Sequence, residues 1–225
     1  WALKLTIAAT AFGVILSTLH QSALGALFLM APTKLHPLWY SPFLPMFFFI
    51  SSIIAGLSMV IVESMLSHKI FHDPVAPEHT VDLDAITLGL GKAASVVLFT
   101  YFFLKLLGVA DGNHWSLLTT PLGYWFVVEM LGFILLPSFL FAHGVRAGRA
   151  SFVRGTAVLT VIGIVLNRLN VSLVAFNWNA AERYIPSGME LITSITIITL
   201  GVLTFRWIVN RMPVLREHRD YRDAH

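Results

Sequence analysis

The sequence predicts an all-α protein, a polytopic bundle of transmembrane helices. Of its 225 residues, 56% are hydrophobic and only 12% are charged, whereas a soluble globular domain carries about 25% charged residues. Backbone that faces lipid must satisfy its own hydrogen bonds, which favours helices. Six apolar segments are long enough to cross a bilayer as helices, and they cover about residues 3–30, 44–67, 86–107, 122–143, 152–174 and 188–209. We therefore expect a helical bundle over residues 1–210 and a basic cytoplasmic tail over 211–225.

Loop charges predict the orientation of this bundle in a bacterial inner membrane. If the spans alternate in direction, the loops on one side receive nine basic residues, namely Lys69, Arg146, Arg149, Arg154, Arg206, Arg211, Arg216, Arg219 and Arg222. The opposite loops receive only Lys34 and Arg183. By the positive-inside rule the first side is cytoplasmic, and so are both ends of the chain. We interpret the C-terminal arginines as a topology signal and expect no nucleic-acid partner.

The residue composition limits the cofactors that this chain can hold. It contains no cysteine, so it offers no thiolates for an iron–sulfur cluster and no attachment site for a c-type haem. A b-type haem needs two facing axial ligands, but only His20 of the nine histidines lies well inside a span, so haem is not expected. A metal centre is not expected either, because no histidine and carboxylate cluster shares a helix face.

The first span carries a polar pair that is costly in hydrocarbon, His20 and Gln21. Gly13, Ser17, Gln21 and Gly25 recur every four residues and therefore share one ridge of the helix. The small residues predict close approach of a neighbouring helix, with His20 pointed into the crevice beside the ridge. A hydrogen-bonded packing role for His20 is the alternative.

Other spans place polar residues at a similar depth, near the outer face. Glu129 lies in the fourth span, where Pro137 predicts a kink. In the fifth span Arg168 lies one position off a polar and small stripe formed by Thr156, Thr160, Gly163, Asn167 and Asn170. Lys105, Arg168 and Glu190 lie near helix ends, where snorkelling or an ion pair explains them as well as a function does. For the two asparagines, hydrogen bonding between helices is the alternative, and Glu63 lies near the inner interface.

A quinone suits this set of residues, because it needs an apolar slot, donors for its ring carbonyls and a group that exchanges protons. We expect His20 to donate to the ring, with Gln21 or Glu129 nearby, and Asn167 and Arg168 to line or brace the site. Glu129, and Glu63 on an inward route, are the candidates for proton transfer.

Two motifs, Leu19–Gly25 (LHQSALG) and Lys34–Tyr40 (KLHPLWY), resemble the integral membrane subunit of the NrfD/polysulfide-reductase family. Together with Asn167–Asn170 and the segment 176–186, they resemble in particular the HybB-like "cytochrome b" subunit of membrane-bound nickel–iron hydrogenases. The resemblance extends over essentially the whole chain. It also implies that further helices of the family precede Trp1.

The resemblance implies a quinone-reactive membrane anchor of a hydrogenase-like respiratory oxidoreductase complex. Such a subunit has no redox centre of its own and passes electrons between the menaquinone or ubiquinone pool and an iron–sulfur subunit. That partner and a catalytic subunit would dock on the outer face, with or without proton translocation. A secondary transporter or proton-conducting channel is the alternative, although no paired Gly/Pro-interrupted spans are evident. A purely structural anchor is a third.

Overall fold

The computed structural model describes residues 2–71, 77–176, 178–180, 184 and 186–211. It contains two compact units, residues 1–181 and 182–225, which are considered separately. Six helices in the described part of the chain are long and apolar enough to cross a membrane, which confirms the predicted all-helical multi-pass fold. Arg183 and the predicted basic tail beyond Arg211 lie outside the described residues.

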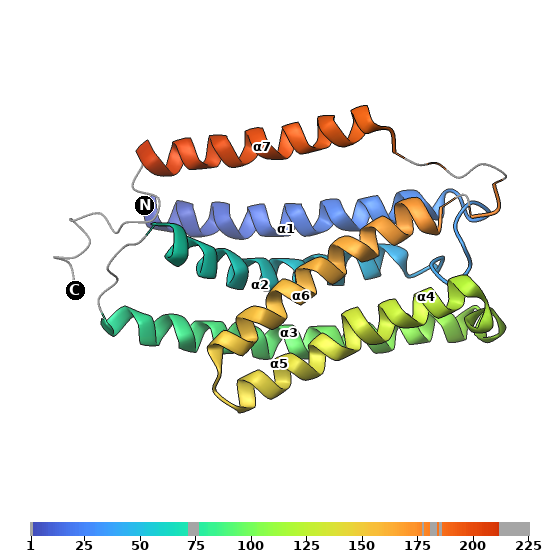
Figure 1. The fold of residues 1–225 in the computed structure, drawn as a ribbon, viewed down its shortest axis with the longest axis horizontal. Coiled ribbons are helices and arrows are strands. Elements are labelled where there is room, and N and C mark those ends of the chain that lie inside the picture. The colour runs from blue at the N-terminus through green and yellow to red at the C-terminus, as the bar shows by residue number, and fades with distance from the viewer. Residues whose placement is uncertain (1, 72–76, 177, 181–183, 185, 212–225) are drawn as a thin grey trace. The chain divides into compact units, whose positions relative to one another are not determined.

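The first unit is a helical bundle. Its helices are α1 (Ala2–Leu29), α2 (Leu44–Phe71), α3 (Pro77–Asp111), α4 (Pro121–Met130), α5 (Leu136–Arg146) and α6 (Ala150–Leu169). Helix α2 packs against α1, α3 and α6, and α3 also packs against α5 and α6 (Figure 1). The segments 30–43 and 112–120 lie at the same end of this bundle, which we call the loop end (Figure 1).

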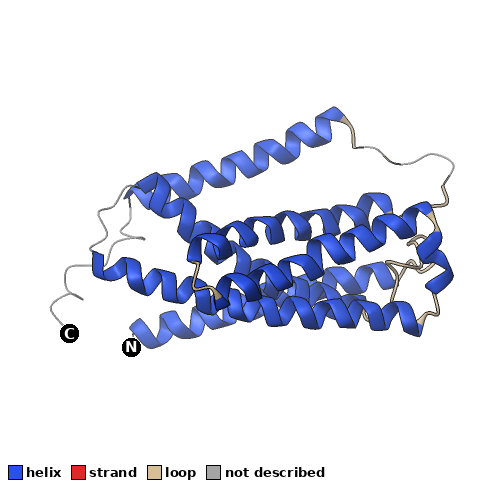
Figure 2. Ribbon diagram, turned by 60° about the horizontal axis from the view of Figure 1, so that its bottom comes forward, coloured by secondary structure: helices blue, strands red, loops and turns tan. Residues whose placement is uncertain are grey.

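Regular structure in the described residues is helical throughout (Figure 2). The loop end has one isolated antiparallel bridge, between Leu35 and Phe176. Helix α4 begins with Pro121 in its first turn, and the Thr120 hydroxyl caps it by accepting a hydrogen bond from the Gly123 amide at 3.1 Å.

Two π-helical turns interrupt the spans near the polar residues. The turn η2 (Leu131–Leu135) joins α4 to α5, and η3 (Asn170–Val174) ends the span of α6. The irregularity predicted at Pro137 therefore lies in the preceding turn. This is expected because proline lacks an N–H and its ring meets the carbonyl four residues earlier. Such turns are rare and often occur at functional sites.

Small residues bring neighbouring helices into close contact at two places. A Cβ on Gly25 of α1 would lie 2.9 Å from the Leu44 carbonyl oxygen, and a Cβ on Gly163 of α6 would lie 2.9 Å from Phe133 Cβ. The predicted close approach along the first span is thus confirmed at Gly25. It is not found at Gly13, where an added Cβ would meet nothing within 4 Å.

The second unit contains α7 (Gly188–Arg211), and its first turn forms a capping box. The Ser187 amide donates to the Glu190 carboxylate at 3.0 Å, and the Ser187 hydroxyl accepts from the Glu190 amide at 3.4 Å. Tyr184 donates to the same carboxylate, and this hydrogen bond raises the pKa of the phenol. Glu190 therefore has a local structural role at this helix start.

Candidate functional site

A buried carboxylate, Glu129 near the end of α4, gathers polar side chains from four parts of the chain. Its Oε1 accepts from Lys105 Nζ at 3.3 Å and from the Asn167 amide. Its Oε2 accepts from Trp39 Nε1 at 3.1 Å and from Asn170 Nδ2 at 2.6 Å. Glu129 is 2% exposed, so four donors replace the water that the carboxylate loses on burial. We call these five residues the Glu129 cluster.

The charge of Glu129 is balanced within the cluster by Lys105 of α3, which is itself buried. Aromatic rings complete the surroundings of this cation, since Lys105 Nζ lies 5.7 Å from the Tyr101 ring centroid and 5.6 Å from that of Phe126. Buried ion pairs persist only when their remaining polar atoms are also bonded. Asn170, which donates to Glu129, is also hydrogen-bonded at its other polar atom, because its Oδ1 accepts from Trp125 Nε1 at 3.0 Å.

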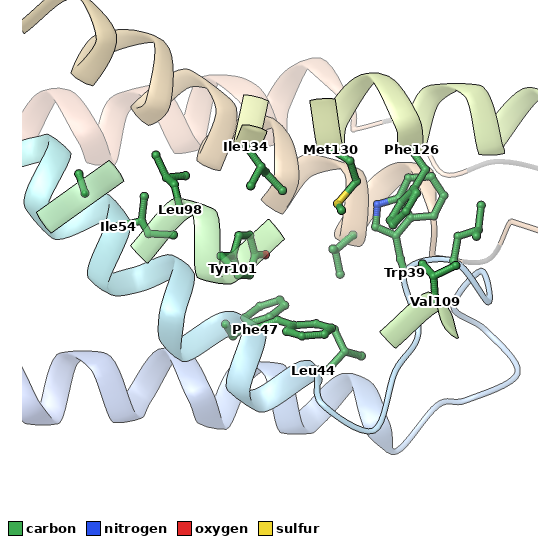
Figure 3. Close-up of a cluster of buried hydrophobic side chains, with 14 of the residues drawn as sticks. Trp39, Leu44, Phe47, Ile54, Leu98, Tyr101, Val109, Phe126, Met130 and Ile134 are labelled. Atoms are coloured by element: carbon green, nitrogen blue, oxygen red, sulfur yellow. The ribbon is translucent and has the colours of Figure 1, made fainter. Parts of the chain in front are cut away.

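Aromatic packing fixes Trp39 against the cluster. Figure 3 shows its indole beside Phe126, and the two ring centroids are 5.1 Å apart with nearly perpendicular planes. Tyr101 lies deeper in the same region, with its ring 6.1 Å from that of Phe47 (Figure 3). A loop residue and three spans, α2, α3 and α4, are therefore packed as one core beside the carboxylate.

His36 ties the first loop to the residues that follow α6. Its backbone amide donates to the Ala175 carbonyl at 2.9 Å, and its Nδ1 accepts from the Leu38 amide at 3.2 Å. Its ring lies 4.8 Å from the Trp178 ring. Burial, and secondarily the nearby His114, lower the pKa of His36. The neutral imidazole is therefore part of the folded loop end.

A groove of about 620 Å³ lies between α1, α2 and α6. This volume is in the range of small-molecule sites. Its lining is mostly apolar, with Ser17, Gln21, Ser52 and Arg168 as polar members. Along α6, Arg168 is the lining residue nearest the loop end.

Arg168 is held in place but not fully hydrogen-bonded. Its Nη2 donates to the Ser51 hydroxyl at 2.9 Å and to the Phe48 carbonyl at 3.4 Å, and its guanidinium centre lies 3.7 Å from the Phe48 ring centroid. Its Nη1 is buried and has no partner in the described structure. A buried donor without an acceptor is costly, so Nη1 keeps a hydrogen-bonding capacity that no described protein group uses.

The structure brings together four of the six predicted site residues in two groups. Glu129 and Asn167 are in direct contact, while Gln21 and Arg168 line the groove. Glu63 is exposed on α2. The expectation that His20 points into a crevice is wrong. Gln21 lines the groove, whereas His20, about 100° round the helix from Gln21, is exposed.

Sequence reasoning missed several members of the site. Trp39 belongs to the motif KLHPLWY, but nothing in that motif indicates its hydrogen bond to Glu129, 90 residues later in the chain. For Lys105 the sequence leaves an ion pair as an alternative to a function, and the structure shows such a pair with Glu129. Ser51 carried no signal in the sequence. Within the described residues, no three His, Cys, Asp or Glu side chains are grouped closely enough to hold a metal ion.

Comparison with known proteins supports the family resemblance. A family model described as polysulphide reductase, NrfD, matches residues 3–177. A relative from Nitratidesulfovibrio vulgaris Hildenborough, named only "Protein", is 57% identical over 99% of this chain and 58% of its own length. The "Probable Ni/Fe-hydrogenase 2 b-type cytochrome subunit" of Escherichia coli K12 is 28% identical over 91% of this chain and 52% of its own length.

The chain thus spans between half and three fifths of the length of these curated relatives. No solved structure gives a significant match. The family model covers most of the chain and the whole of the Glu129 cluster. The chain therefore belongs to the NrfD polysulphide-reductase family, whose members are membrane subunits of oxidoreductase complexes.

Proposed function

We propose that this chain is the quinone-reactive part of such a membrane subunit, and that the groove between α1, α2 and α6 takes the quinone. The observation that carries the proposal is the buried, unpartnered Nη1 of Arg168 beside an apolar groove of about 620 Å³. An isoprenoid tail needs apolar walls open to lipid, and a ring carbonyl needs a donor. The groove offers both.

Arg168 and Gln21 are the proposed donors to the quinone ring. Arg168 is anchored by Ser51 and by the Phe48 ring, so its guanidinium is positioned before the ligand arrives. Gln21 faces it from α1. Asn167 acts indirectly, because its amide nitrogen donates to Glu129. The role of His20 as a donor to the quinone ring remains a prediction, and its exposed position on α1 does not support it.

Glu129 is the proposed group that exchanges protons with the quinone. Asn167 donates to it, and the next residue in the chain, Arg168, lines the groove. Reduction of one quinone to quinol consumes two electrons and two protons, and oxidation returns them. The electrons would be exchanged with an iron–sulfur partner that docks at the loop end, on the periplasmic side of a bacterial inner membrane. A catalytic subunit, hydrogenase-like by the name of the Escherichia coli relative, would complete the complex.

Substituting Arg168 in the assembled complex tests this proposal. Arg168→Met should raise the KM for a quinone analogue about tenfold or more, as expected for loss of a charged hydrogen-bond donor worth about 1.5 to 3 kcal/mol. Electron transfer from the natural donor to decyl-ubiquinone or a menaquinone analogue is the measurement.

A second arginine provides the matched control. Arg154 forms an exposed ion pair with Asp84, with Nη2 and Oδ1 2.6 Å apart, away from the groove. Arg154→Met should leave the quinone KM unchanged. An unchanged KM in Arg168→Met, in a complex that assembles normally, contradicts the proposed quinone site.

A further inference from the structure

Two small cavities adjoin the Glu129 cluster. The first, which we call the Glu129 cavity, is lined by Ser51, Tyr101, Glu129, Ile164 and Asn167 among others, and has a volume of about 10 Å³. The second, the Lys105 cavity, also has a volume of about 10 Å³. Its lining includes Trp39, Ser41, Tyr101, Lys105 and Asn167. Each volume is close to the minimum that one water molecule requires, and each wall carries several polar groups.

Shared residues place the two cavities and the groove next to one another. Ile164 lines both the groove and the Glu129 cavity. Tyr101 and Asn167 line both cavities. The Lys105 cavity also touches Ser41 and Gly108, so it lies toward the loop end. The three spaces therefore follow one another from the groove to the loop end, with Glu129 and Lys105 between them.

The Lys105–Glu129 ion pair can pass a proton from one cavity to the other without leaving a buried charge that lacks a counter-ion. If Glu129 accepts a proton from the groove side, Lys105 is left as a buried cation without a counter-ion, which is costly. Loss of a proton from Lys105 to the Lys105 cavity removes that cost. The pair then returns to its ionic form when the proton on Glu129 moves to Lys105, which lies 3.3 Å away.

We infer that the Lys105–Glu129 pair relays protons between the groove and the loop end through water in these two cavities. The inference rests on the proposed quinone site, because the quinone supplies or consumes the protons. For each quinol oxidised, two electrons go to the iron–sulfur partner and two protons leave through the pair one after the other. Reduction of quinone runs the same steps in reverse.

Lys105→Arg separates a relay from a purely structural ion pair. Arginine keeps the cation and can keep the pairing, but its guanidinium does not release protons in proteins. Quinone-linked turnover should fall about 100-fold, the scale of positioned proton transfer, while the quinone KM and the thermal stability remain unchanged. Lys92→Arg, on an exposed lysine of the same helix, is the matched control and should turn over normally.

A second variant carries the test if Lys105→Arg does not assemble. Tyr101→Phe removes only the hydroxyl of a residue that lines both cavities, and it should slow turnover and alter the solvent deuterium isotope effect. Tyr124→Phe, on the exposed face of α4, should change neither.

The outcomes distinguish the relay from the quinone site itself. Wild-type turnover and isotope effect in Lys105→Arg or Tyr101→Phe, combined with a raised quinone KM in Arg168→Met, overturn the relay and leave the quinone site standing. An unchanged KM in Arg168→Met overturns the quinone site, and the relay with it. Slow turnover in both relay variants at unchanged KM supports the inference.

Discussion

At the scale of single residues, the stability of the bundle depends on keeping Glu129 and Lys105 paired. Removing one member leaves the other as an uncompensated buried charge, whereas removing both can be nearly neutral. Glu129→Gln should therefore destabilise the protein by about 3 to 5 kcal/mol, and the double variant Glu129→Gln with Lys105→Met should recover much of that loss. Thermal denaturation of the three proteins in detergent is the measurement.

The control for this cycle is an exposed ion pair. Arg154→Met breaks the contact with Asp84 and should cost at most about 1 kcal/mol. A double variant as unstable as Glu129→Gln alone would show that the carboxylate, and not its pairing with Lys105, is what the bundle requires.

Residue positions were predictable to the extent that helical periodicity fixes them. Thr156, Thr160, Gly163, Asn167 and Asn170 recur at helical spacing, and the structure buries all five. The partners of Glu129 were not predictable, because spacing along one helix does not say which neighbouring helix it faces. Trp39 belongs to a loop, where no periodicity operates.

At the scale of elements, the contact between α6 and η2 depends on a glycine. A Cβ on Gly163 would lie 2.9 Å from Phe133 Cβ, whereas one on Gly155 of the same helix would meet nothing within 4 Å. Gly163→Ala should destabilise the protein by about 1 to 3 kcal/mol through overpacking. Gly155→Ala should be neutral or stabilising by up to about 1 kcal/mol, since alanine is the better helix former.

Thermal denaturation compares these two variants directly, and a lowered melting temperature in Gly163→Ala alone is the expected result. Equal effects would contradict the account of this packing contact. A displaced η2 should also weaken the quinone reaction, because Glu129 lies two residues before that turn.

The loop end should respond to pH through His36. Because its pKa is lowered in the folded protein, the unfolded chain binds the proton first as the pH falls below about 6.5, so the free energy of unfolding decreases with falling pH. The thermal midpoint should thus drop between about pH 7.5 and pH 5.5. His36→Asn, which keeps a hydrogen-bond acceptor but does not titrate, should reduce that drop.

The matched control is His143, an exposed histidine near the end of α5. His143→Asn should keep the wild-type pH dependence. A wild-type pH dependence in His36→Asn would show that other groups control the stability of the loop end.

Among the elements, the six spans were predictable because their length and apolar character are set by the bilayer. The two π turns were not, although Pro137 marked the region of the first. A proline predicts that the helix is disturbed but not how the chain absorbs the missing hydrogen bond. Asn170 begins the second turn, so ideal helices alone would not have predicted its contact with Glu129.

At the scale of the whole molecule, the chain matches between half and three fifths of the length of its curated relatives. The quinone reaction proposed for the chain is therefore best tested in the assembled complex. The predicted orientation in the membrane and the proposed docking of an iron–sulfur partner at the loop end are properties that such a complex would reveal. The sequence contains no cysteine, so we expect any iron–sulfur cluster of the complex to belong to a partner subunit.

The most direct test of the quinone site is photolabelling of the assembled complex with an azidoquinone, followed by peptide mass spectrometry. If the groove takes the quinone, label should appear on its lining residues, such as Gln21 of α1, Met59 of α2 and Val165 of α6, and excess unmodified quinone should abolish it. Label confined to other parts of the complex, with none on these three helices, would contradict it.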